Sequence, residues 1–156
     1  QAFHLKIRIP ELLYSEGLSP LPEQKILIQI DTVPQNFSYT PDAPLISKFE
    51  VLTHINAVPA DIILSQKIFA AFNRKRPMGR DFFDIIFLYE IGIEPNFKYL
   101  EKNLSIKSNS DLKSYMQEKS AALNFKLLAK DVEPFIFFSQ DARKVELFPN
   151  FLQTIA

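Results

Sequence analysis

The sequence predicts an α+β fold, in which a small antiparallel or mixed sheet from the N-terminal half packs against a mainly helical C-terminal bundle. Residues 3–9 (FHLKIRI) and 25–33 (KILIQIDTV) alternate apolar and polar side chains, which is the pattern of a strand with one buried face. From residue 61 onward the sequence reads as helix, with apolar side chains recurring at helical spacing. We therefore expect a strand-rich domain at residues 1–58 and a helical domain at residues 59–156.

Composition sets the class of protein before any motif is considered. With 156 residues, 47% of them hydrophobic and 15 of them Phe, the chain can bury a substantial core and is not disordered. Lys and Arg number 18, as do Asp and Glu, so any binding to nucleic acid must come from a local patch. The absence of Cys excludes disulfides and thiol nucleophiles, and no apolar run is long enough to span a bilayer. Because no signal peptide is visible, a cytoplasmic location is expected.

The two N-terminal strands are predicted to form an antiparallel hairpin with a long connection. Residues 12–22 (LLYSEGLSPLP) are expected to be a loop because they contain Gly and Pro turn residues. Residues 35–44 are polar and Pro-rich and predict a second loop, whereas residues 47–55 (SKFEVLTHI) alternate weakly and indicate a third strand. Two histidines this scattered, His4 and His54, do not make a zinc site.

The chain is organised around residues 67–84 (KIFAAFNRKRPMGRDFFD), where two helical segments meet at a basic turn. A Pro and a Gly are expected to break the first helix after Arg76. The second helix is predicted over residues 80–92 and is apolar almost all round, except along the line of Asp81 and Asp84. A helix of this kind is normally buried, and buried carboxylates are costly unless a cation or a hydrogen-bond donor meets them.

Further helices are predicted along the C-terminal part of the chain. Residues 95–103 form a short helix with Pro in its first turn, and a longer helix begins at Ser110. Residues 125–138 are helical up to Pro134, and residues 141–151 end the chain. The aromatic side chains of this tail are expected to be core residues, because they are not interleaved with a basic run.

The charged residues beside the basic turn are the candidates for a site. On an ideal helix Lys67 and Arg74 fall on one stripe. In a purely structural role, Arg80 and Asp84 would form an ion pair one helical turn apart. Asp81 would then cap its helix, and Lys67 would lie in solvent. Spacing alone leaves this structural role and a functional role open.

A Lys-x-x-Ala-x-x-x-Arg pattern is followed by Arg-Asp-x-x-Asp, at Lys67, Ala70, Arg74, Arg80, Asp81 and Asp84. This combination resembles the AbiEii/AbiGii nucleotidyltransferase toxin family. The flanking stretches IQIDTVP and AKDVEPFIFF resemble it too, so the similarity spans residues 3–152. The resemblance implies a nucleotidyltransferase-like fold, in which the hairpin and residues 47–55 belong to a mixed sheet with the helices packed on one side.

The resemblance also implies an activity. Members of the family are bacterial toxins that use Mg²⁺ to transfer a nucleotide from an NTP to an RNA acceptor, which is tRNA in some relatives, and a cognate antitoxin restrains them. On this basis Lys67 would contact a phosphate of the bound nucleotide, and Asp81 would deprotonate or position the acceptor. Arg74 and Arg80 would stabilise phosphoryl charge, and Asp84 completes the catalytic motif.

The metal-binding part is where the sequence departs from the family. The Gly-Ser signature followed by Asp-x-Asp, which carries two metal-binding carboxylates, is not found in this sequence. Asp31 is the candidate for a further metal-binding carboxylate, with Gln29 where the family often has an acid. The equal alternative is that Asp31 simply ends a strand beside a turn. We therefore expect either a truncated portion or a decayed copy of the gene, which by itself does not transfer nucleotides. The alternative is a non-catalytic binding or interaction module on the same scaffold, and a general RNA-binding domain ranks last.

Overall fold

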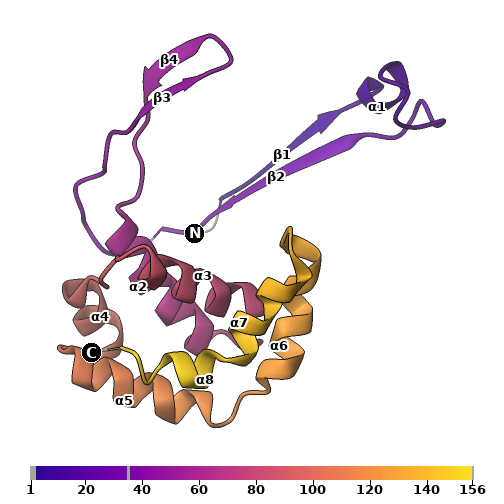
Figure 1. Ribbon diagram of the computed structural model, residues 1–156. Helices are drawn as coiled ribbons and strands as arrows, with labels where there is room; N and C mark the ends of the chain where they lie inside the picture. Colours follow the sequence, from indigo (N-terminus) through magenta and orange to yellow (C-terminus); the bar gives the residue numbers. More distant parts are fainter. Residues whose placement is uncertain (1–2, 35, 156) are drawn as a thin grey trace. The chain divides into compact units, whose positions relative to one another are not determined.

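The computed structural model describes residues 3–34 and 36–155 and confirms the predicted α+β class (Figure 1). The chain divides into two compact units, Gln1–Tyr39 and Thr40–Ala156. In the first unit the described elements are two strands and one short helical turn, whereas the second contains a small hairpin followed by the longer helices. The domain division expected at residue 58 stays a prediction.

The first unit is built on an antiparallel hairpin of β1 (Phe3–Ile9) and β2 (Ile26–Thr32), as the alternating pattern predicts. The connection between them is not loop throughout, because Leu12–Ser15 form one helical turn, α1. The register of the strands places His4 opposite Asp31. Since side chains alternate across a strand, the apolar residues of β1 share one face with the isoleucines of β2, and the histidine and the carboxylate share the other.

The second unit opens with a hairpin where a single strand is predicted. β3 (Leu45–Lys48) and β4 (Val51–His54) pair antiparallel, so the prediction of one strand over residues 47–55 is wrong. Phe49 and Glu50 reverse the chain with φ angles of 51° and 63°, the left-handed conformation of a tight two-residue turn. Neither residue is Gly or Asn, so the sequence carries no turn signal there. The described strands form two separate antiparallel pairs, and the expected mixed sheet is therefore wrong for them.

Two helices, α2 (Ala60–Asn73) and α3 (Gly79–Glu90), pack against each other on either side of the basic turn. α2 ends earlier than predicted because Arg74 has an extended backbone, with φ −74° and ψ 146°. α3 ends before Gly92, whose φ of 79° is the left-handed stop expected of Gly. One side of α3 is buried, whereas Phe87 is 51% exposed. The composition of this helix predicts burial all round, and that prediction is wrong.

The remaining helical segments complete the second unit: α4 (Phe97–Leu104), α5 (Asn109–Ser120), α6 (Phe125–Val132), η1 (Glu133–Phe135), η2 (Ser139–Ala142), α7 (Arg143–Glu146) and α8 (Phe148–Phe151). Side-chain caps from Asn96, Ser108 and Asn124 begin α4, α5 and α6. α4 therefore starts after the predicted Pro, and α6 ends just before Pro134, as predicted. Within the described residues, every helix is too short or too polar to cross a membrane.

The core of the helical unit contains a cluster of aromatic rings among aliphatic side chains, and we call this cluster the aromatic core. One ring each from α2, α3, α6 and α8 contributes, with neighbouring centroids 5.0 to 6.3 Å apart: Phe72, Phe82, Phe125 and Phe148. The prediction that tail aromatics are core residues is thus confirmed for the last two of these. It is wrong for three others, which are mostly exposed because they follow Pro134 and lie outside the packed helices: Phe135, Phe137 and Phe138. The aromatic core holds α3 against α2 and α6.

Candidate functional site

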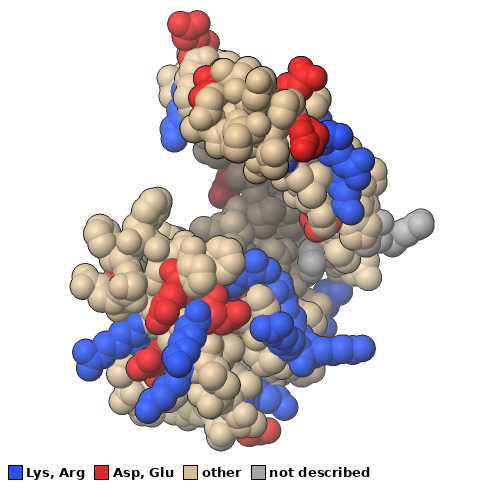
Figure 2. Space-filling view, turned by 90° about the vertical axis from the view of Figure 1, so that its right-hand side faces the viewer, with Lys and Arg blue, Asp and Glu red and all other residues tan. Residues whose placement is uncertain are grey.

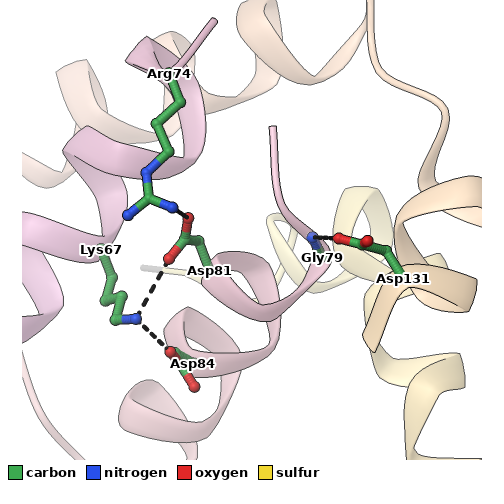
Figure 3. Close-up of polar contacts among 6 residues, drawn as sticks. All are labelled: Lys67, Arg74, Gly79, Asp81, Asp84 and Asp131. Atoms are coloured by element: carbon green, nitrogen blue, oxygen red, sulfur yellow. Dashed lines mark hydrogen bonds and ion pairs between the residues drawn. The ribbon is translucent and has the colours of Figure 1, made fainter. Parts of the chain in front are cut away.

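Four charged side chains meet where α2 packs on α3, and we call them the charged cluster: Lys67, Arg74, Asp81 and Asp84 (Figure 3). Lys67 Nζ lies 2.6 Å from Asp84 Oδ2 and 3.3 Å from Asp81 Oδ1. Arg74 approaches the second oxygen of Asp81, with 3.2 Å between Nη1 and Oδ2. Asp81 therefore lies between two cations, and Lys67 is shared between two carboxylates.

Helix geometry and core packing together explain why these side chains meet. Lys67 lies within α2, and Arg74 immediately follows its last residue. Asp81 lies in the first turn of α3, and Asp84 follows on the same side of that helix. Phe82, beside Asp81, is 0% exposed and packs edge-on against Phe72 of α2, which sets the rotation of α3. The aromatic core thus brings Lys67 and Arg74 to face Asp81 and Asp84.

Asp81 is the buried member of the charged cluster. Its side chain is 0% exposed, against 30% for Lys67 and 43% for Arg74. Burying a carboxylate is costly unless cations or donors meet it, and here two cations do. The Arg74 contact has the distance of an ion pair but not the N–H alignment of a hydrogen bond, so Oδ2 accepts none from the described residues. Asp81 therefore keeps the capacity to accept one further hydrogen bond.

The ion pairs and the helix cap in the structure differ from those expected if these residues had a purely structural role. No ion pair joins Arg80 to Asp84 in the part of the chain that the structure describes, because Lys67 of the facing helix reaches Asp84 instead. Asp81 does not cap α3, since the N-cap residue is Met78 and the helix start has no side-chain cap from it. Arg80 is exposed and lies outside the ion-paired group. Four of the five predicted helical site residues are thus brought together.

Sequence reasoning misses one charged residue close to the cluster. Asp131 of α6 accepts a hydrogen bond from the backbone N–H of Gly79, with 3.1 Å between N and Oδ2 (Figure 3). Its Oδ1 also lies 3.9 Å from Nη2 of Arg76. The only signal is the acid within the AKDVEPF stretch. Its partner cannot be found from spacing, because Gly79 lies 52 positions away.

The residue predicted to bind a metal lies in the first unit. Asp31 Oδ1 is 2.6 Å from His4 Nδ1, and Oδ2 accepts a hydrogen bond of 2.8 Å from Gln29 Nε2. The hydrogen bond with His4, and then that with Gln29, hold the pKa of Asp31 below its ordinary value. Gln29 thus donates to Asp31, where an acid at the same position would repel it.

The residues described do not by themselves fit a magnesium site. Mg²⁺ takes an octahedral set of oxygen ligands, one or two of them usually carboxylates. Both oxygens of Asp31 are hydrogen-bonded, and residues 3–34 and 36–155 contain no group of three or more His, Asp or Glu side chains that could hold a metal ion. The assignment of Asp31 as a metal ligand therefore stays a prediction.

Charges of both signs are intermixed over the helical unit. Figure 2 shows acidic side chains near the centre of the lower part of the molecule, with basic side chains beside them and several of these gathered on one side. This distribution agrees with the equal numbers of basic and acidic residues, 18 of each. Binding of phosphate on this face would therefore depend on a few cations at one place rather than on a general positive field.

Comparison with known proteins identifies the family. Neither a curated protein nor a solved structure matches the chain. The family model described as nucleotidyl transferase AbiEii toxin, type IV TA system, matches residues 1–143, which contain the charged cluster, Asp31 and Asp131. The resemblance seen in the Lys-x-x-Ala-x-x-x-Arg and Arg-Asp-x-x-Asp motifs is thereby confirmed. The chain belongs to the AbiEii family of nucleotidyl transferase toxins of type IV toxin–antitoxin systems.

Proposed function

We propose that this chain supplies the nucleotide- and acceptor-binding side of an enzyme that transfers a nucleotide from an NTP to an RNA acceptor. The observation that carries the proposal is Asp81, a fully buried carboxylate between Lys67 and Arg74 with one oxygen that accepts no hydrogen bond from the described residues. A buried carboxylate oxygen without a hydrogen-bond partner is rare in native proteins, and a place in a functional site is one explanation for it. Membership of a nucleotidyl transferase family supports the same assignment.

Asp81 is proposed to orient the acceptor hydroxyl. Its Oδ2 accepts the hydroxyl O–H, while Lys67 holds Oδ1 at 3.3 Å. Arg74 covers Oδ2 and is 43% exposed, so the acceptor reaches this oxygen by displacing a guanidinium that is free to move outward. Holding the hydroxyl in a fixed orientation beside the phosphoryl group is the contribution proposed for this oxygen.

The neighbouring cations are proposed to bind the phosphates of the NTP. The charged cluster has two cations and two anions, so it has no net positive charge for a triphosphate. The additional charge comes from Arg80, which is exposed and forms no ion pair in the described part of the chain, together with Arg74 once it leaves Asp81. Positive charge beside the phosphoryl group stabilises the charge that develops during transfer.

A second candidate function is a non-catalytic interaction module on the same scaffold. The observation that favours it is that each carboxylate of the charged cluster is paired with a cation of the same chain. Such a cluster satisfies its own buried charge and needs no ligand. In that case Lys67 and Asp81 hold α2 on α3, and neither touches a substrate.

The two functions are separated by a transfer assay on the full-length protein. The protein is incubated with labelled NTPs, Mg²⁺ and total RNA, beside Lys67→Ala, Asp81→Asn and the control Lys98→Ala, whose lysine is exposed on α4. We expect label on RNA with wild type and with the control, and a loss of about 100-fold or more in both site variants. Folded site variants that keep wild-type transfer, or a wild-type protein that transfers nothing, would favour the interaction module.

Toxicity and its control are tested in cells. Expression of the full-length protein in the bacterial cytoplasm is expected to arrest growth, and the cognate antitoxin is expected to restore it. Lys67→Ala is expected to remove the arrest without antitoxin. Arrest that persists at equal protein levels in Lys67→Ala would separate toxicity from the proposed site.

A further inference from the structure

We propose that Asp131 is a positioning residue that holds the first turn of α3, and through it aims Asp81 at the acceptor. This inference rests on the proposed function of Asp81. Asp131 does not belong to the charged cluster and comes from a different helix, α6. Figure 3 shows its carboxylate directed at Gly79, the first residue of α3, while Asp81 lies on the same turn and faces Lys67 and Arg74.

The contact replaces a missing helix cap. The first N–H groups of a helix have no partner within that helix, and the side chain of the N-cap residue commonly accepts from one of them. In α3 the N-cap residue is Met78, which has no acceptor oxygen in its side chain. Asp131 Oδ2 accepts from the N–H of Gly79 instead, at 3.1 Å. A negative charge at this end of a helix is also favoured by the helix dipole.

Close backbone packing places the cap accurately. A Cβ atom added to Gly79 would lie 1.9 Å from the carbonyl oxygen of Leu128, which is on α6 one turn before Asp131. Only Gly therefore lets the start of α3 approach the backbone of α6 this closely. The contact and the hydrogen bond act on the same residue from the same helix. Together they define where the first turn of α3, and hence Asp81, lies relative to α6.

Asp131 also contacts the turn that leads out of α2. Its Oδ1 lies 3.9 Å from Nη2 of Arg76, and its side chain is 30% exposed while that of Arg76 is 83% exposed. A pair this exposed contributes little to stability. The contribution of Asp131 to the position of α3 therefore comes mainly from the oxygen that accepts from the N–H of Gly79. An amide side chain can supply such an oxygen too.

This distinction makes Asp131→Asn and Asp131→Ala a matched pair. The Asn variant keeps an oxygen that accepts from Gly79 and loses the charge, whereas the Ala variant loses both. A displacement of a catalytic group by about 1 Å can lower a rate by about 100-fold. Because Asp131 is not proposed to touch the nucleotide, its loss should lower kcat and leave the KM for NTP unchanged. Glu133→Ala, at an exposed acid just beyond α6, is the control.

The test combines amide hydrogen exchange with steady-state transfer kinetics on the full-length protein. In Asp131→Ala we expect exchange at Gly79, Arg80 and Asp81 to rise about 10-fold and kcat to fall about 10- to 100-fold, with the KM for NTP within about 2-fold of wild type. Asp131→Asn and Glu133→Ala should stay within about 3-fold of wild type in both measurements. Equal losses in the Asn and Ala variants would overturn the proposal, as would unchanged exchange or unchanged kcat in the folded Ala variant.

The two readouts also separate this inference from the proposed function. If the wild-type protein transfers no nucleotide, the function proposed for Asp81 fails, and the positioning role of Asp131 fails with it. Faster exchange at Gly79 in Asp131→Ala would then identify Asp131 as a helix cap alone. If wild type transfers nucleotide and Lys67→Ala does not, but Asp131→Ala matches wild type in kcat, only the positioning role is overturned.

Discussion

Replacing Lys67 with Met tests whether the charged cluster holds α2 on α3. Met keeps most of the aliphatic length of Lys and removes only the ammonium group. Asp81 is 0% exposed in the wild-type structure, and the variant removes the cation that lies 3.3 Å from its Oδ1. Arg74 remains 3.2 Å from Oδ2, so the buried charge is left with one partner instead of two. We expect the helical unit to be destabilised.

The size of the effect follows from distance and burial. Two unit charges 3.3 Å apart attract by about 5 kcal/mol at an effective dielectric constant of about 20, before desolvation is counted. Hydrogen bonds to charged groups contribute about 1.5–3 kcal/mol net. Lys67 is 30% exposed and is shared with Asp84, itself 39% exposed, which reduces its net contribution. We therefore expect Lys67→Met to lower the free energy of unfolding by about 2 kcal/mol.

The assay is urea unfolding followed by far-UV circular dichroism, which reports the helices, since the long ones belong to the second unit. Lys67→Met, Asp81→Asn and the double variant form a double-mutant cycle. The double variant should be less destabilised than the sum of the single variants by about 2 kcal/mol. Lys98→Met, at an exposed position of α4, is the control and should stay within about 0.5 kcal/mol of wild type.

Additivity would refute this reasoning. If the two single effects sum to that of the double variant within about 0.5 kcal/mol, then Lys67 and Asp81 do not stabilise each other. The same conclusion follows if Lys98→Met costs as much as Lys67→Met, because loss of any lysine would then account for the effect.

Two further predictions concern pH. Burial, and then the charge of Glu94, raise the pKa of Tyr89 to about 12. An unfolded Tyr ionises at about pH 10, so the stabilising contribution is complete below that pH and is lost as the pH rises toward 12. Tyr89→Phe should flatten this alkaline decline in urea unfolding, and an unchanged decline would show that another group causes it. In the first unit, His4→Ala should raise the pKa of Asp31 more than Gln29→Ala does, because the hydrogen bond with His4 is the larger cause of its lowered pKa. Carboxyl NMR titration measures both, and a larger shift in Gln29→Ala would reverse this order.

Elements governed by local pattern are those that the sequence predicts well. The alternation in residues 3–9 and 25–33 predicts the first hairpin, and Gly92 correctly predicts where α3 stops. The turn at Phe49 and Glu50 is not predictable in this way, because both residues adopt positive φ without being Gly or Asn. The exposure of the tail aromatics is also not predictable, since hydrophobic character does not show whether a neighbouring helix covers a side chain.

For the candidate site too, the sequence predicts some features and not others. The motif residues Lys67 and Asp81 can be selected from their order in the chain and their resemblance to a family. The ion-pair partners cannot be predicted from the sequence. The i, i+4 spacing favours Arg80 as the partner of Asp84, whereas in the structure Lys67 of the facing helix is its partner. Asp131 is the extreme case, because its contact with Gly79 spans 52 positions and is made by a backbone N–H, which every non-Pro residue carries.

By itself the sequence determined the α+β class, the family and the helix stripes on which the charged residues lie, because each depends on residue type and spacing within one segment. Only the tertiary structure decided that Asp81 is buried between Lys67 and Arg74, and that Asp131 caps α3. The physical reason is that spacing determines the face of a helix on which a side chain lies. The aromatic core and the close approach of Gly79 to α6 determine which faces meet.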